Sequence, residues 1–433
     1  MPRALPAVAL AALAVLLAAG MSGCATSAER SEVAVPADAA TLAEAMDLVS
    51  PGGVITIAAG TYAEQLVVDK ADVTIRGEDR NRTVIDGEGI RPYGIVGLAG
   101  GVRIENLTVT GATFYGVLIS GVHDGDQPAD PGGDSYTGWD PDKFPPLERF
   151  LVDHVTAYNN GLYGVYAFNA RHGVIRDSYA SGSADSGFYV GQCEQCDILV
   201  TGNVAERNAV GFENANASDS VVVTGNRFSG NRVGITLLSS YQEAFTPQRA
   251  NAVVGNLVSD NTATDSPAQA EGGFATGVGI SGGQDNVLER NRITGNPRAA
   301  VILANTEDIP ARGNRFVGNV VDGGVWLANL SAARTPASGN CWADAVDTAP
   351  AELVAQLAAA CSGDDAPQAA VATLGGPAAP AGVSFLRVAA PRDQPQLERP
   401  VGRGPLPATV TMPDLAGVPV PDVMFLADRA GTR

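Results

Sequence analysis

A short apolar word that begins with glycine, once with alanine, returns along the middle of this chain. The words are Gly164-Val165-Tyr166-Ala167, Gly187-Phe188-Tyr189-Val190, Gly211-Phe212-Glu213-Asn214, Gly234-Ile235-Thr236-Leu237, Gly277-Val278-Gly279-Ile280, Ala300-Val301-Ile302-Leu303 and Gly324-Val325-Trp326-Leu327. Their first positions are separated by 23, 24, 23, 43, 23 and 24 residues. Such a period predicts a solenoid of stacked repeats, and the long step predicts an insertion of about 20 residues near 243–273.

Each word alternates as a strand with two faces does. Successive side chains of a strand point to opposite faces, so the apolar letters one and three places after the glycine are expected to fill the core. The letters between them are expected to point outward. These outward letters are Leu118, Tyr166, Tyr189, Glu213, Thr236, Gly279, Ile302 and Trp326, with Phe168 and Leu238 alongside.

A second word supplies asparagines at regular places. Asn203, Asn226, Asn256, Asn291 and Asn314 are each followed five residues later by another asparagine. Asparagine tolerates left-handed backbone and bonds within its own turn, so one asparagine per turn is expected to stack into a ladder.

The segments before and after the repeats read differently. Leu42, Ala45, Met46 and Val49 have helical spacing within residues 38–49, and short strand-like runs follow. An Ala-rich stretch at 350–360 predicts a closing helix. Beyond it the chain is rich in Pro and Ala, and we expect an irregular tail along the solenoid that docks through the apolar segments 383–388 and 418–426.

The opening segment carries a resemblance to a known superfamily. The words Thr41-Leu42-Ala43-Glu44-Ala45, Gly60-Thr61-Tyr62, Val73-Thr74-Ile75-Arg76-Gly77-Glu78 and Val84-Ile85-Asp86-Gly87 resemble the first turns of right-handed parallel β-helix proteins of the pectate-lyase-like superfamily. In those proteins an amphipathic helix caps the open end. The resemblance implies an all-β, right-handed parallel β-helix of about ten coils over residues 38–345, with a capping helix before it and a C-terminal helix and irregular tail over 346–433.

The N-terminus predicts export. Arg3 precedes an apolar run at 7–19, and Met21-Ser22-Gly23-Cys24 resembles the lipobox of bacterial lipoproteins. The resemblance implies a signal peptide at 1–23, lipidation of Cys24, a tether at 24–37 and an extracytoplasmic protein anchored to the membrane. The alternative is an ordinary signal peptide with an incidental cysteine.

The net charge limits the classes of partner that we expect. The net charge of −19 argues against nucleic acid, and an anionic polysaccharide would need a bridging cation or local arginines. We expect a monomer.

Apart from Cys24 the chain has four cysteines, an even number typical of an oxidising compartment. Cys341 and Cys361 are expected to form a disulfide around the closing helix. Cys193 and Cys196 are expected to bridge a tight turn, because too few further ligands exist for a zinc site.

The outward letters give the candidate site. Neighbouring coils lie about 4.8 Å apart, so Tyr166, Tyr189 and Glu213 are expected to form one row. Aromatic rings beside a carboxylate suit a sugar, and Phe168 and Trp326 are added as ligand-binding candidates. The alternative is that this stripe seats the tail or an inserted loop.

Several acidic residues are candidates for chemistry. Glu213, Tyr189 and Asp185 are the catalytic candidates, and Asp177 joins Asp185 and Glu213 as a possible acid/base or Ca²⁺ cluster. A second Ca²⁺ candidate is the Asp-rich insertion at 122–148. Its acidic residues are Asp124, Asp126, Asp134, Asp140 and Asp142.

Asp153-His154 resembles a word of pectate lyases, but the spacing aligns it with the turn positions of Asn203 and Asn226. A histidine that replaces a ladder asparagine is the expected outcome there. The characteristic sequence motifs of polygalacturonases, pectin esterases and alginate epimerases are missing or altered in this chain. For example, it has Asp140-Pro141-Asp142, whereas the epimerase motif ends in histidine.

These patterns leave three functions open. The first is an exported protein that binds carbohydrate or serves as a surface scaffold. The second is a polysaccharide lyase, hydrolase or epimerase acting at the outward face. The third is a periplasmic metal-handling protein, because the repeats also resemble those of the copper-handling accessory protein for nitrous oxide reductase; three histidines and five methionines are few for that role.

Overall fold

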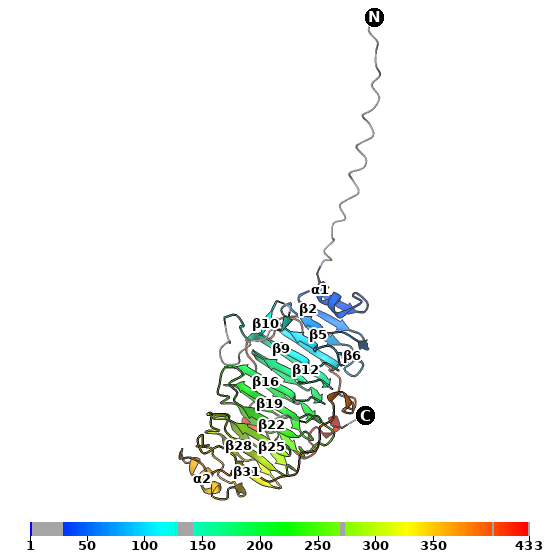
Figure 1. The fold of residues 1–433 in the computed structure, drawn as a ribbon. Coiled ribbons are helices and arrows are strands. Elements are labelled where there is room, and N and C mark those ends of the chain that lie inside the picture. Colours follow the sequence, from blue (N-terminus) through cyan, green and yellow to red (C-terminus); the bar gives the residue numbers. More distant parts are fainter. Residues whose placement is uncertain (2–28, 126, 129–141, 269–272, 401, 432–433) are drawn as a thin grey trace.

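The structure is a computed structural model that describes residues 1, 29–125, 127–128, 142–268, 273–400 and 402–431. Its coils stack from the blue N-terminal end to the yellow end at α2 (Figure 1). Most coils contribute three short strands, and each strand pairs in parallel with its equivalent in the next coil. The strands therefore form three columns, of which the first two belong to one 19-stranded sheet and the third is an 11-stranded sheet.

The first column contains β1 (Arg30–Val35), β2 (Val49–Ile57), β5 (Thr74–Gly77), β8 (Val102–Thr110), β12 (Leu147–Tyr158), β14 (Ala170–Arg176), β17 (Ile198–Thr201), β20 (Val221–Thr224), β23 (Ala252–Val254), β26 (Val287–Glu289) and β29 (Arg315–Val317). The second contains β3 (Gly60–Tyr62), β6 (Thr83–Asp86), β15 (Tyr179–Ser181), β18 (Val204–Glu206), β21 (Arg227–Phe228), β24 (Leu257–Ser259), β27 (Arg292–Thr294) and β30 (Val320–Val321). The long strands β8 and β12 continue from the first column into the second.

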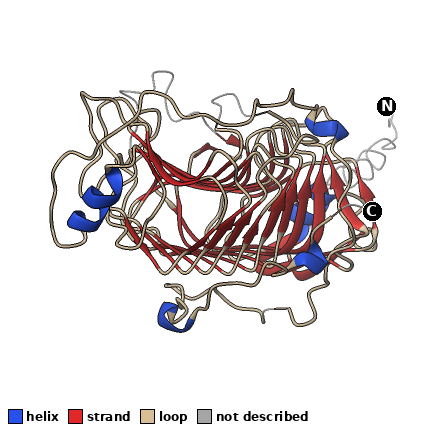
Figure 2. Ribbon diagram, turned by 90° about the horizontal axis from the view of Figure 1, so that it is seen from below, coloured by secondary structure: helices blue, strands red, loops and turns tan. Residues whose placement is uncertain are grey.

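The 11-stranded sheet contains β4 (Leu66–Val68), β7 (Tyr93–Gly97), β9 (Tyr115–Ser120), β13 (Val165–Phe168), β16 (Ser186–Cys193), β19 (Val210–Ala217), β22 (Val233–Leu238), β25 (Thr276–Ser281), β28 (Ala299–Ala304), β31 (Val325–Asn329) and β32 (Thr348–Ala349). A small antiparallel pair, β10 (His123–Asp124) and β11 (Gln127–Pro128), lies outside both sheets. Figure 2 shows the strands around a common interior, with loops and short helices outside them.

The inward letters of the glycine words fill that interior, as the alternation predicts. Val165, Phe188, Phe212, Ile235 and Val278 are register partners in successive strands, and all are fully buried in one continuous core. A column of apolar side chains one coil apart leaves no gap for water, so each coil is stabilised by the two beside it.

Asparagines form ladders at the corners of the coils. In one, Asn203 donates through Nδ2 to Asn226 Oδ1 at 3.0 Å, and Asn226 donates in turn to Asn256 at 2.9 Å. Asn208 and Asn231 begin a second ladder at the next corner. The predicted ladders are therefore present, and each member is a buried amide whose donors and acceptors are used by its neighbours.

A third ladder corrects one assignment made from the spacing. Asn286, Asn314 and Asn340 are bonded at the corner that precedes the first column. Asn314 belongs there, and Asn319 bonds to Asn291 in the ladder that spacing had assigned to Asn314. The spacing of five residues recurs between successive corners, so it does not identify which corner an asparagine occupies.

Helices and a disulfide cover the ends of the core. Helix α1 (Leu42–Leu48) begins at Thr41, whose hydroxyl accepts from Glu44 N at 3.1 Å, and buries Leu42, Ala45 and Met46. At the other end, α2 (Leu353–Ala360) buries Leu353 and Leu357, and Cys341 is bonded to Cys361 behind it. Among the described residues no helix has the length and apolar character needed to cross a membrane.

The expected tether is wrong for its last part. Residues Arg30–Val35 form β1, which pairs in parallel with β2, and Val33 and Val35 enter the core. The solenoid therefore begins before the capping helix, which is inserted between its first two strands.

The predicted single insertion is two separate insertions. One replaces the corner between β22 and β23, at residues 239–251, and the other lies between β24 and β25, at residues 260–275. Because both fall within one coil, they add to one long step in the period.

The Pro-rich C-terminus lies along the solenoid, as predicted, but polar contacts hold much of it instead of apolar burial. We call residues 366–400 and 402–431 the strap; it includes the short turns η1 (Phe385–Arg387), η2 (Leu415–Gly417) and η3 (Ala427–Arg429). Leu386, Val423 and Met424 of its apolar segments are exposed. The expectation that these segments dock by apolar burial is therefore wrong for these three side chains, whereas Phe385 and Phe425 are half-buried and Val388 is buried.

Arginine side chains of the solenoid donate to backbone carbonyls of the strap. The pairs are Arg80 with Pro395, Arg103 with Gly402 and Gly404, Arg149 with Leu406, Arg227 with Val423 and Phe425, Arg232 with Pro380 and Ala381, Arg290 with Leu415 and Val418, and Arg292 with Pro421. A segment outside the sheets has carbonyls without strand partners, and guanidinium groups with five donors satisfy them.

Candidate functional site

The outward letters of the 11-stranded sheet form a second apolar cluster outside the main core. It contains Val96, Leu98, Leu118, Tyr166, Tyr189 and Ala215, with Val67, Tyr93, Tyr115, Tyr163, Phe168 and Leu238 packed against it. Tyr166, Tyr189 and Glu213 lie side by side on β13, β16 and β19, in the register that the repeat predicts. The repeat therefore predicts the adjacency of this row correctly.

The row is not exposed as a binding row would be. Tyr166 is 8% exposed, Tyr189 1% and Glu213 8%. The first insertion of the long coil lies against it, because the Tyr189 hydroxyl donates to the Glu243 carboxylate and Gln192 Oε1 accepts from Ala244 N at 3.1 Å. The alternative that the stripe seats an inserted loop thus describes this part of it. The strap's hydrogen bonds go to the other sheet, to corners of the coils and, in the 11-stranded sheet, to Asn329 at the end of β31.

Trp326 does not join the row. In the last full coil Val301 pairs with Leu327 and Ile302 with Ala328, a longer offset than the glycine words suggest. Trp326 packs against the main core, with its ring centroid 6.0 Å from that of Trp342. Its outward placement is therefore wrong, because this coil has gained residues between the two words.

A ladder of tyrosines lies beside the row. The rings of Tyr93 and Tyr115 stack with centroids 5.6 Å apart, and those of Tyr115 and Tyr163 stack at the same distance. All three are half-buried, and neighbouring Phe114 is exposed. We call Tyr93, Tyr115 and Tyr163 the tyrosine ladder. With Phe168, it is the half-buried part of the aromatic cluster, whereas Tyr166 and Tyr189 are buried.

Sequence reasoning missed the tyrosine ladder although a signal was present. Each of its residues stands immediately before a glycine of the repeat, in Tyr93-Gly94, Tyr115-Gly116 and Tyr163-Gly164. The position before the glycine is a column of its own, and three successive coils have tyrosine there. We considered the residues that follow each glycine and therefore overlooked this column.

Carboxylates gather at the downstream end of the ladder. The Ser186 hydroxyl lies 2.8 Å from Glu213 Oε2 and 3.1 Å from Asp185 Oδ1, so it bridges the two acidic side chains. Burial, followed by the charges of Asp185, Glu213 and Glu243, raises the pKa of the Tyr163 hydroxyl. Two of the catalytic candidates, Asp185 and Glu213, are thus brought together.

Glu243 is a member of this cluster that the sequence did not single out. Burial raises the pKa of its carboxyl to about 8, and the hydrogen bond from the Tyr189 hydroxyl opposes this rise. Its Oε2 is buried and has no hydrogen-bond partner among the described residues. A carboxylic acid that keeps its proton at neutral pH can donate as well as accept, beside a tyrosine whose own pKa burial and Glu243 raise.

Protonation of Glu243 predicts a pH dependence of stability. The unfolded side chain ionises near 4.5 and the folded one near 8, so between these values the unfolded state loses its proton first. Stability is therefore expected to fall as pH rises through this window, by up to about 1.4 kcal/mol per pH unit, and then to level off. Urea unfolding across this range measures the slope. Glu243→Gln keeps the shape and is expected to flatten it; an unchanged slope would contradict the assignment.

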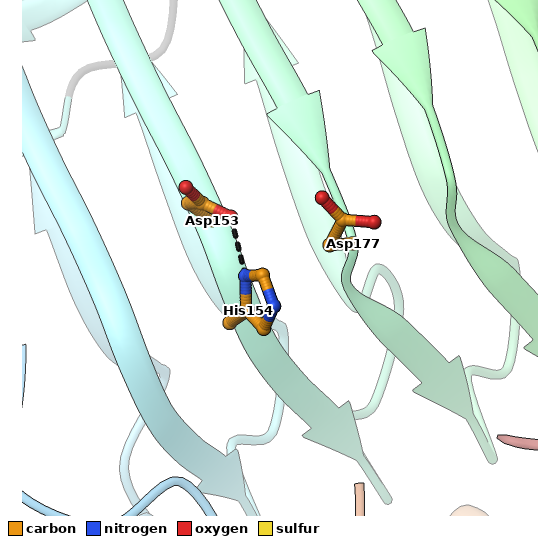
Figure 3. Close-up of side chains that lie close together, drawn as sticks. All are labelled: Asp153, His154 and Asp177. Carbon is orange, nitrogen blue, oxygen red and sulfur yellow. Dashed lines mark hydrogen bonds and ion pairs between the residues drawn. The ribbon is translucent and has the colours of Figure 1, made fainter. Parts of the chain in front are cut away.

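A polar network lies on the 19-stranded sheet, away from the tyrosine ladder. Figure 3 shows Asp153, His154 and Asp177 on neighbouring coils. His154 Nδ1 lies 2.6 Å from Asp153 Oδ1, and Arg176 donates to Asp153 Oδ2 at 2.6 and 2.9 Å. Burial by itself raises the pKa of Asp153, but the hydrogen bonds from His154 and Arg176 outweigh it and hold that pKa below its ordinary value.

The alignment of His154 with the ladder asparagines is wrong by one residue. The register places His154 beside Asp177 and Gly202, and all three have positive φ, at 54°, 49° and 67°. The ladder position belongs to Val155, whose N donates to Ser178 Oγ, while Ser178 N donates to Asn203. His154 thus occupies a left-handed turn position just before the ladder.

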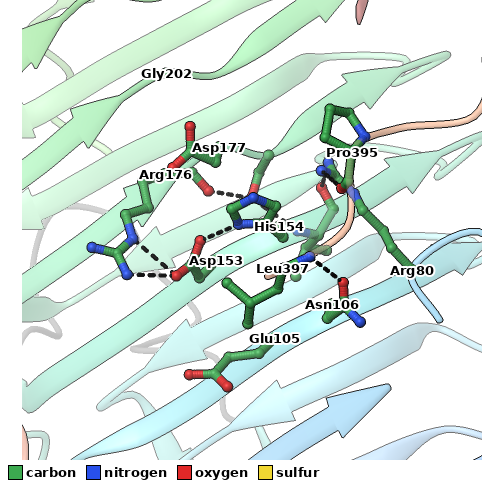
Figure 4. A network of polar contacts seen from close by, with 12 residues as sticks. Arg80, Glu105, Asn106, Asp153, His154, Arg176, Asp177, Gly202, Pro395 and Leu397 are labelled. Carbon is green, nitrogen blue, oxygen red and sulfur yellow. Dashed lines mark hydrogen bonds and ion pairs between the residues drawn. The ribbon is translucent and has the colours of Figure 1, made fainter. Parts of the chain in front are cut away.

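The strap lies over this network. Figure 4 shows Pro395 and Leu397 beside it, with Arg80 donating to Pro395 O and Leu397 N donating to Asn106 Oδ1. In the part of the chain that the structure describes, Asp153, His154 and Asp177 are the one group whose ligand atoms all lie within 4.8 Å of one another. Both Asp153 oxygens are already bonded, one of them to a guanidinium, so this donor set fits a metal ion poorly.

Three expectations have different outcomes in this structure. Asp177 lies beside His154 and not with Asp185 and Glu213, so the predicted trio is divided between two sheets. Cys193 and Cys196 are bonded across the turn after β16, as expected. Cys24 and the greater part of the Asp-rich insertion, including Asp126, Asp134 and Asp140, lie outside the described residues.

Comparison with known proteins agrees with the class of fold. Residues 80–246 match the family described as the right handed beta helix region. This match covers less than half of the chain, and together with the parallel columns of strands it supports a right-handed parallel β-helix fold. No curated protein matches its sequence.

The chain is also similar to several solved structures at low identity. An alginate lyase from Paenibacillus sp. is 16% identical, with 68% of this chain and 97% of that chain covered and a TM-score of 0.42. For the A-module of the Azotobacter vinelandii mannuronan C-5 epimerase AlgE4 the values are 15%, 65%, 83% and 0.36. For a pectin methylesterase from Aspergillus niger they are 13%, 69%, 87% and 0.30.

Proposed function

We propose that this chain is an exported, lipid-anchored protein that binds polysaccharide along the tyrosine ladder. The observation that carries the proposal is the stack of three half-buried tyrosines with acidic side chains at one end. Pyranose rings present C–H faces to aromatic rings, and their hydroxyls donate to carboxylates. The ladder crosses successive coils, so an extended saccharide would lie along the solenoid axis.

Location in the cell envelope supports the same proposal. The signal-like N-terminus and Cys24 favour a protein held at the outer surface of a membrane, where polysaccharides are found. Two disulfides suit an oxidising compartment. Metabolic labelling with a fatty-acid probe tests the anchor, because labelling is expected to disappear in Cys24→Ala.

Glycan binding is tested by removing one ring of the ladder. Tyr163→Ala is expected to weaken binding to a panel of envelope and plant polysaccharides by about tenfold, because it removes stacking on both the sugar and Tyr115. Affinity electrophoresis in polysaccharide gels measures this loss. Tyr163→Phe keeps the ring and should bind nearly as the natural chain does. Tyr158→Ala, on the other sheet, is the matched control.

Either of two results would overturn the proposal. If no polysaccharide retards the natural chain, or if Tyr163→Ala and Tyr158→Ala are retarded equally, the ladder is not a glycan site. Circular dichroism of each variant separates a lost site from a lost fold. A scaffold role would then be the better description of the outer face.

A second candidate function, a polysaccharide lyase, hydrolase or epimerase, is favoured by one observation. Glu243 keeps its proton at neutral pH beside Tyr189, and Glu213 and Asp185 supply carboxylates nearby. A carboxylic acid that keeps its proton and lies near other acidic side chains can serve as a general acid. Mass spectrometry of each incubated glycan detects a product. Any product that Glu243→Gln still forms at the natural rate would exclude this residue from the chemistry.

A further inference from the structure

The first insertion of the long coil forms a loop whose two ends are joined. Ser239 Oγ donates to Gly282 O at 2.7 Å and accepts from Gln248 N at 3.0 Å, so the loop begins and ends at one fixed place. Gln248 is buried, and its Nε2 donates to Asn286 Oδ1 at 2.9 Å. We call residues 240–247 the lid. It is a short loop of irregular backbone outside both sheets, of a kind that moves without disturbing its ends.

Neutral amides hold the lid on the 11-stranded sheet. Asn216 Oδ1 accepts from Ser240 N at 2.9 Å, and its Nδ2 donates to Ser240 O at 2.6 Å and to Glu243 O at 3.0 Å. Gln192 Oε1 accepts from Ala244 N at 3.1 Å. The charge of these amides does not change with pH, so they favour the closed position at every pH.

Glu243 places an ionisable group between the lid and the row beneath it. The residue is half-buried, but its carboxyl reaches the aromatic cluster. There Oε1 accepts from the Tyr189 hydroxyl, and Oε2 is buried without a hydrogen-bond partner among the described residues. A neutral carboxylic acid tolerates such surroundings, whereas a carboxylate loses its hydration there and receives little in exchange.

The segments around Glu243 supply no cation to compensate its negative charge. Arg249, which follows the lid, already pairs with Glu194 at 3.1 Å and Asp219 at 2.9 Å. Neither lysine nor arginine occurs in residues 160–169, 183–192, 209–217 and 233–248. An ionised Glu243 is therefore better placed in water than under the lid.

The other titratable groups near Glu243 do not replace it as the switch. Burial, and then the charge of Glu243, raises the pKa of the Tyr166 and Tyr189 hydroxyls, so both stay neutral while Glu243 titrates. At the exposed edge of the lid, Tyr241 donates to Asp308 Oδ1 at 2.6 Å. The remaining groups on this face of the sheet are Tyr163, Asp185 and Glu213, which bring no positive charge.

We propose that the lid is a pH-dependent gate over the row of Tyr166, Tyr189 and Glu213, closed while Glu243 is protonated and open when Glu243 ionises. This inference adds a regulation to the proposed glycan site, and its consequence for binding rests on the proposed function. The opening of the lid itself does not.

Protons favour the closed lid. The pKa of the Glu243 carboxyl is about 8 under the lid, and its ordinary value of 4.5 applies once the lid has carried it into water. Between these two values the open form loses its proton first. The ratio of open to closed molecules is therefore expected to rise about tenfold per pH unit in this window and to level off above it.

An open lid would lengthen the aromatic surface of the glycan site. Tyr163 of the tyrosine ladder packs against Tyr166 and Tyr189, with ring centroids 4.5 and 4.8 Å apart. Both of these rings are buried in the closed form. Removal of Glu243 from the Tyr189 hydroxyl would uncover them, so a saccharide would stack on more rings at higher pH.

Hydrogen exchange followed by mass spectrometry measures the opening in the full chain without any glycan. Peptides that cover residues 240–247 are compared in the natural chain and in Glu243→Gln, whose neutral amide still accepts from Tyr189 at every pH. Division of the two exchange rates removes the intrinsic pH dependence of exchange. This quotient is expected to rise by about tenfold to a hundredfold between about pH 5.5 and about pH 7.5.

A control variant and a comparison of peptides make the result specific. Asp265→Asn removes an exposed carboxylate from the second insertion of the same coil and should behave as the natural chain does. Lid peptides should also exchange faster than peptides of β16 and β19. A quotient that stays constant with pH overturns the gate, and so does exchange of lid and strand peptides at one common rate, because the lid would then not open by itself.

Polysaccharide gels run at the same two pH values connect the gate to the glycan site. Retardation of the natural chain is expected to increase several-fold at the higher pH, and that of Glu243→Gln to stay constant. If the lid opens but binding is equal at both values, the regulation is overturned and the glycan site stands. If the lid opens and no polysaccharide binds at either value, the proposed function is lost and the gate is a property of the fold alone.

Discussion

Asn226→Ala is expected to destabilise the fold by about 3–5 kcal/mol, the largest loss that we predict for a single side chain. Its Nδ2 donates to Val200 O and Asn256 Oδ1, and its Oδ1 accepts from the backbone and side chain of Asn203. Alanine would remove all four bonds. Asn203 Nδ2 would keep its bond to Ile175 O and Asn256 Oδ1 would keep the one from the backbone N of residue 226, whereas Val200 O and Asn203 N would lose their asparagine partner. Because ladder members polarise one another, the loss should exceed that of an isolated hydrogen bond.

Urea unfolding measures this loss against a matched control. Asn305→Ala removes a half-buried asparagine that bonds only Glu307 O and Ala332 N at the surface, and it is expected to destabilise by about 1 kcal/mol. Equal losses in the two variants would show that the ladder contributes no more than ordinary turn bonds.

The second large effect is expected for Arg80→Met. Arg80 is fully buried, and its guanidinium donates to Thr156 Oγ1, Val155 O and Pro395 O. Burial, with a smaller contribution from Arg429, lowers the pKa of this guanidinium, so its charge is tolerated only because these acceptors surround it. Methionine fills a similar volume but leaves the acceptors unpaired, and we expect a loss of about 2–4 kcal/mol.

Limited proteolysis adds a readout specific to the strap. In Arg80→Met the segment around Pro395 loses one of its anchors, so cleavage is expected to appear there sooner than in the natural chain and before the solenoid is attacked. Arg82→Met is the control, since that side chain is exposed and pairs only with Asp79. If both variants resist the protease equally, Arg80 does not hold the strap.

The fold could be predicted from the sequence because every coil repeats the same pattern of residues. Glycine words with alternating apolar letters, such as Gly187-Phe188-Tyr189-Val190, define a strand and its inner face, and corner asparagines define the turns. A solenoid contacts only its neighbours, so these local patterns add up to the whole. Where a coil departs from the period, as at Trp326 and Asn314, register read from the sequence fails.

The site was predictable only in part. Periodicity brought Tyr166, Tyr189 and Glu213 together, yet it carries no information about what covers them. Glu243 reaches Tyr189 from a loop of irregular backbone, and loop paths depend on many weak contacts rather than on a repeating pattern. The position of the strap along the solenoid was predicted, but its contacts with arginines were not, because those contacts are to backbone carbonyls, which every sequence has.

The path of the strap has a consequence for how the molecule comes apart. It begins beside Ser338 in the last coils and reaches the first strand, where Arg403 pairs with Glu32 of β1. A plain stack of coils frays from its ends, since a terminal coil has one neighbour instead of two. Here the strap contacts both ends of the solenoid and so links the last coils to the first. Peeling of the first coil breaks this contact as well as its contacts with the second coil, so the strap is expected to make melting of the array more cooperative.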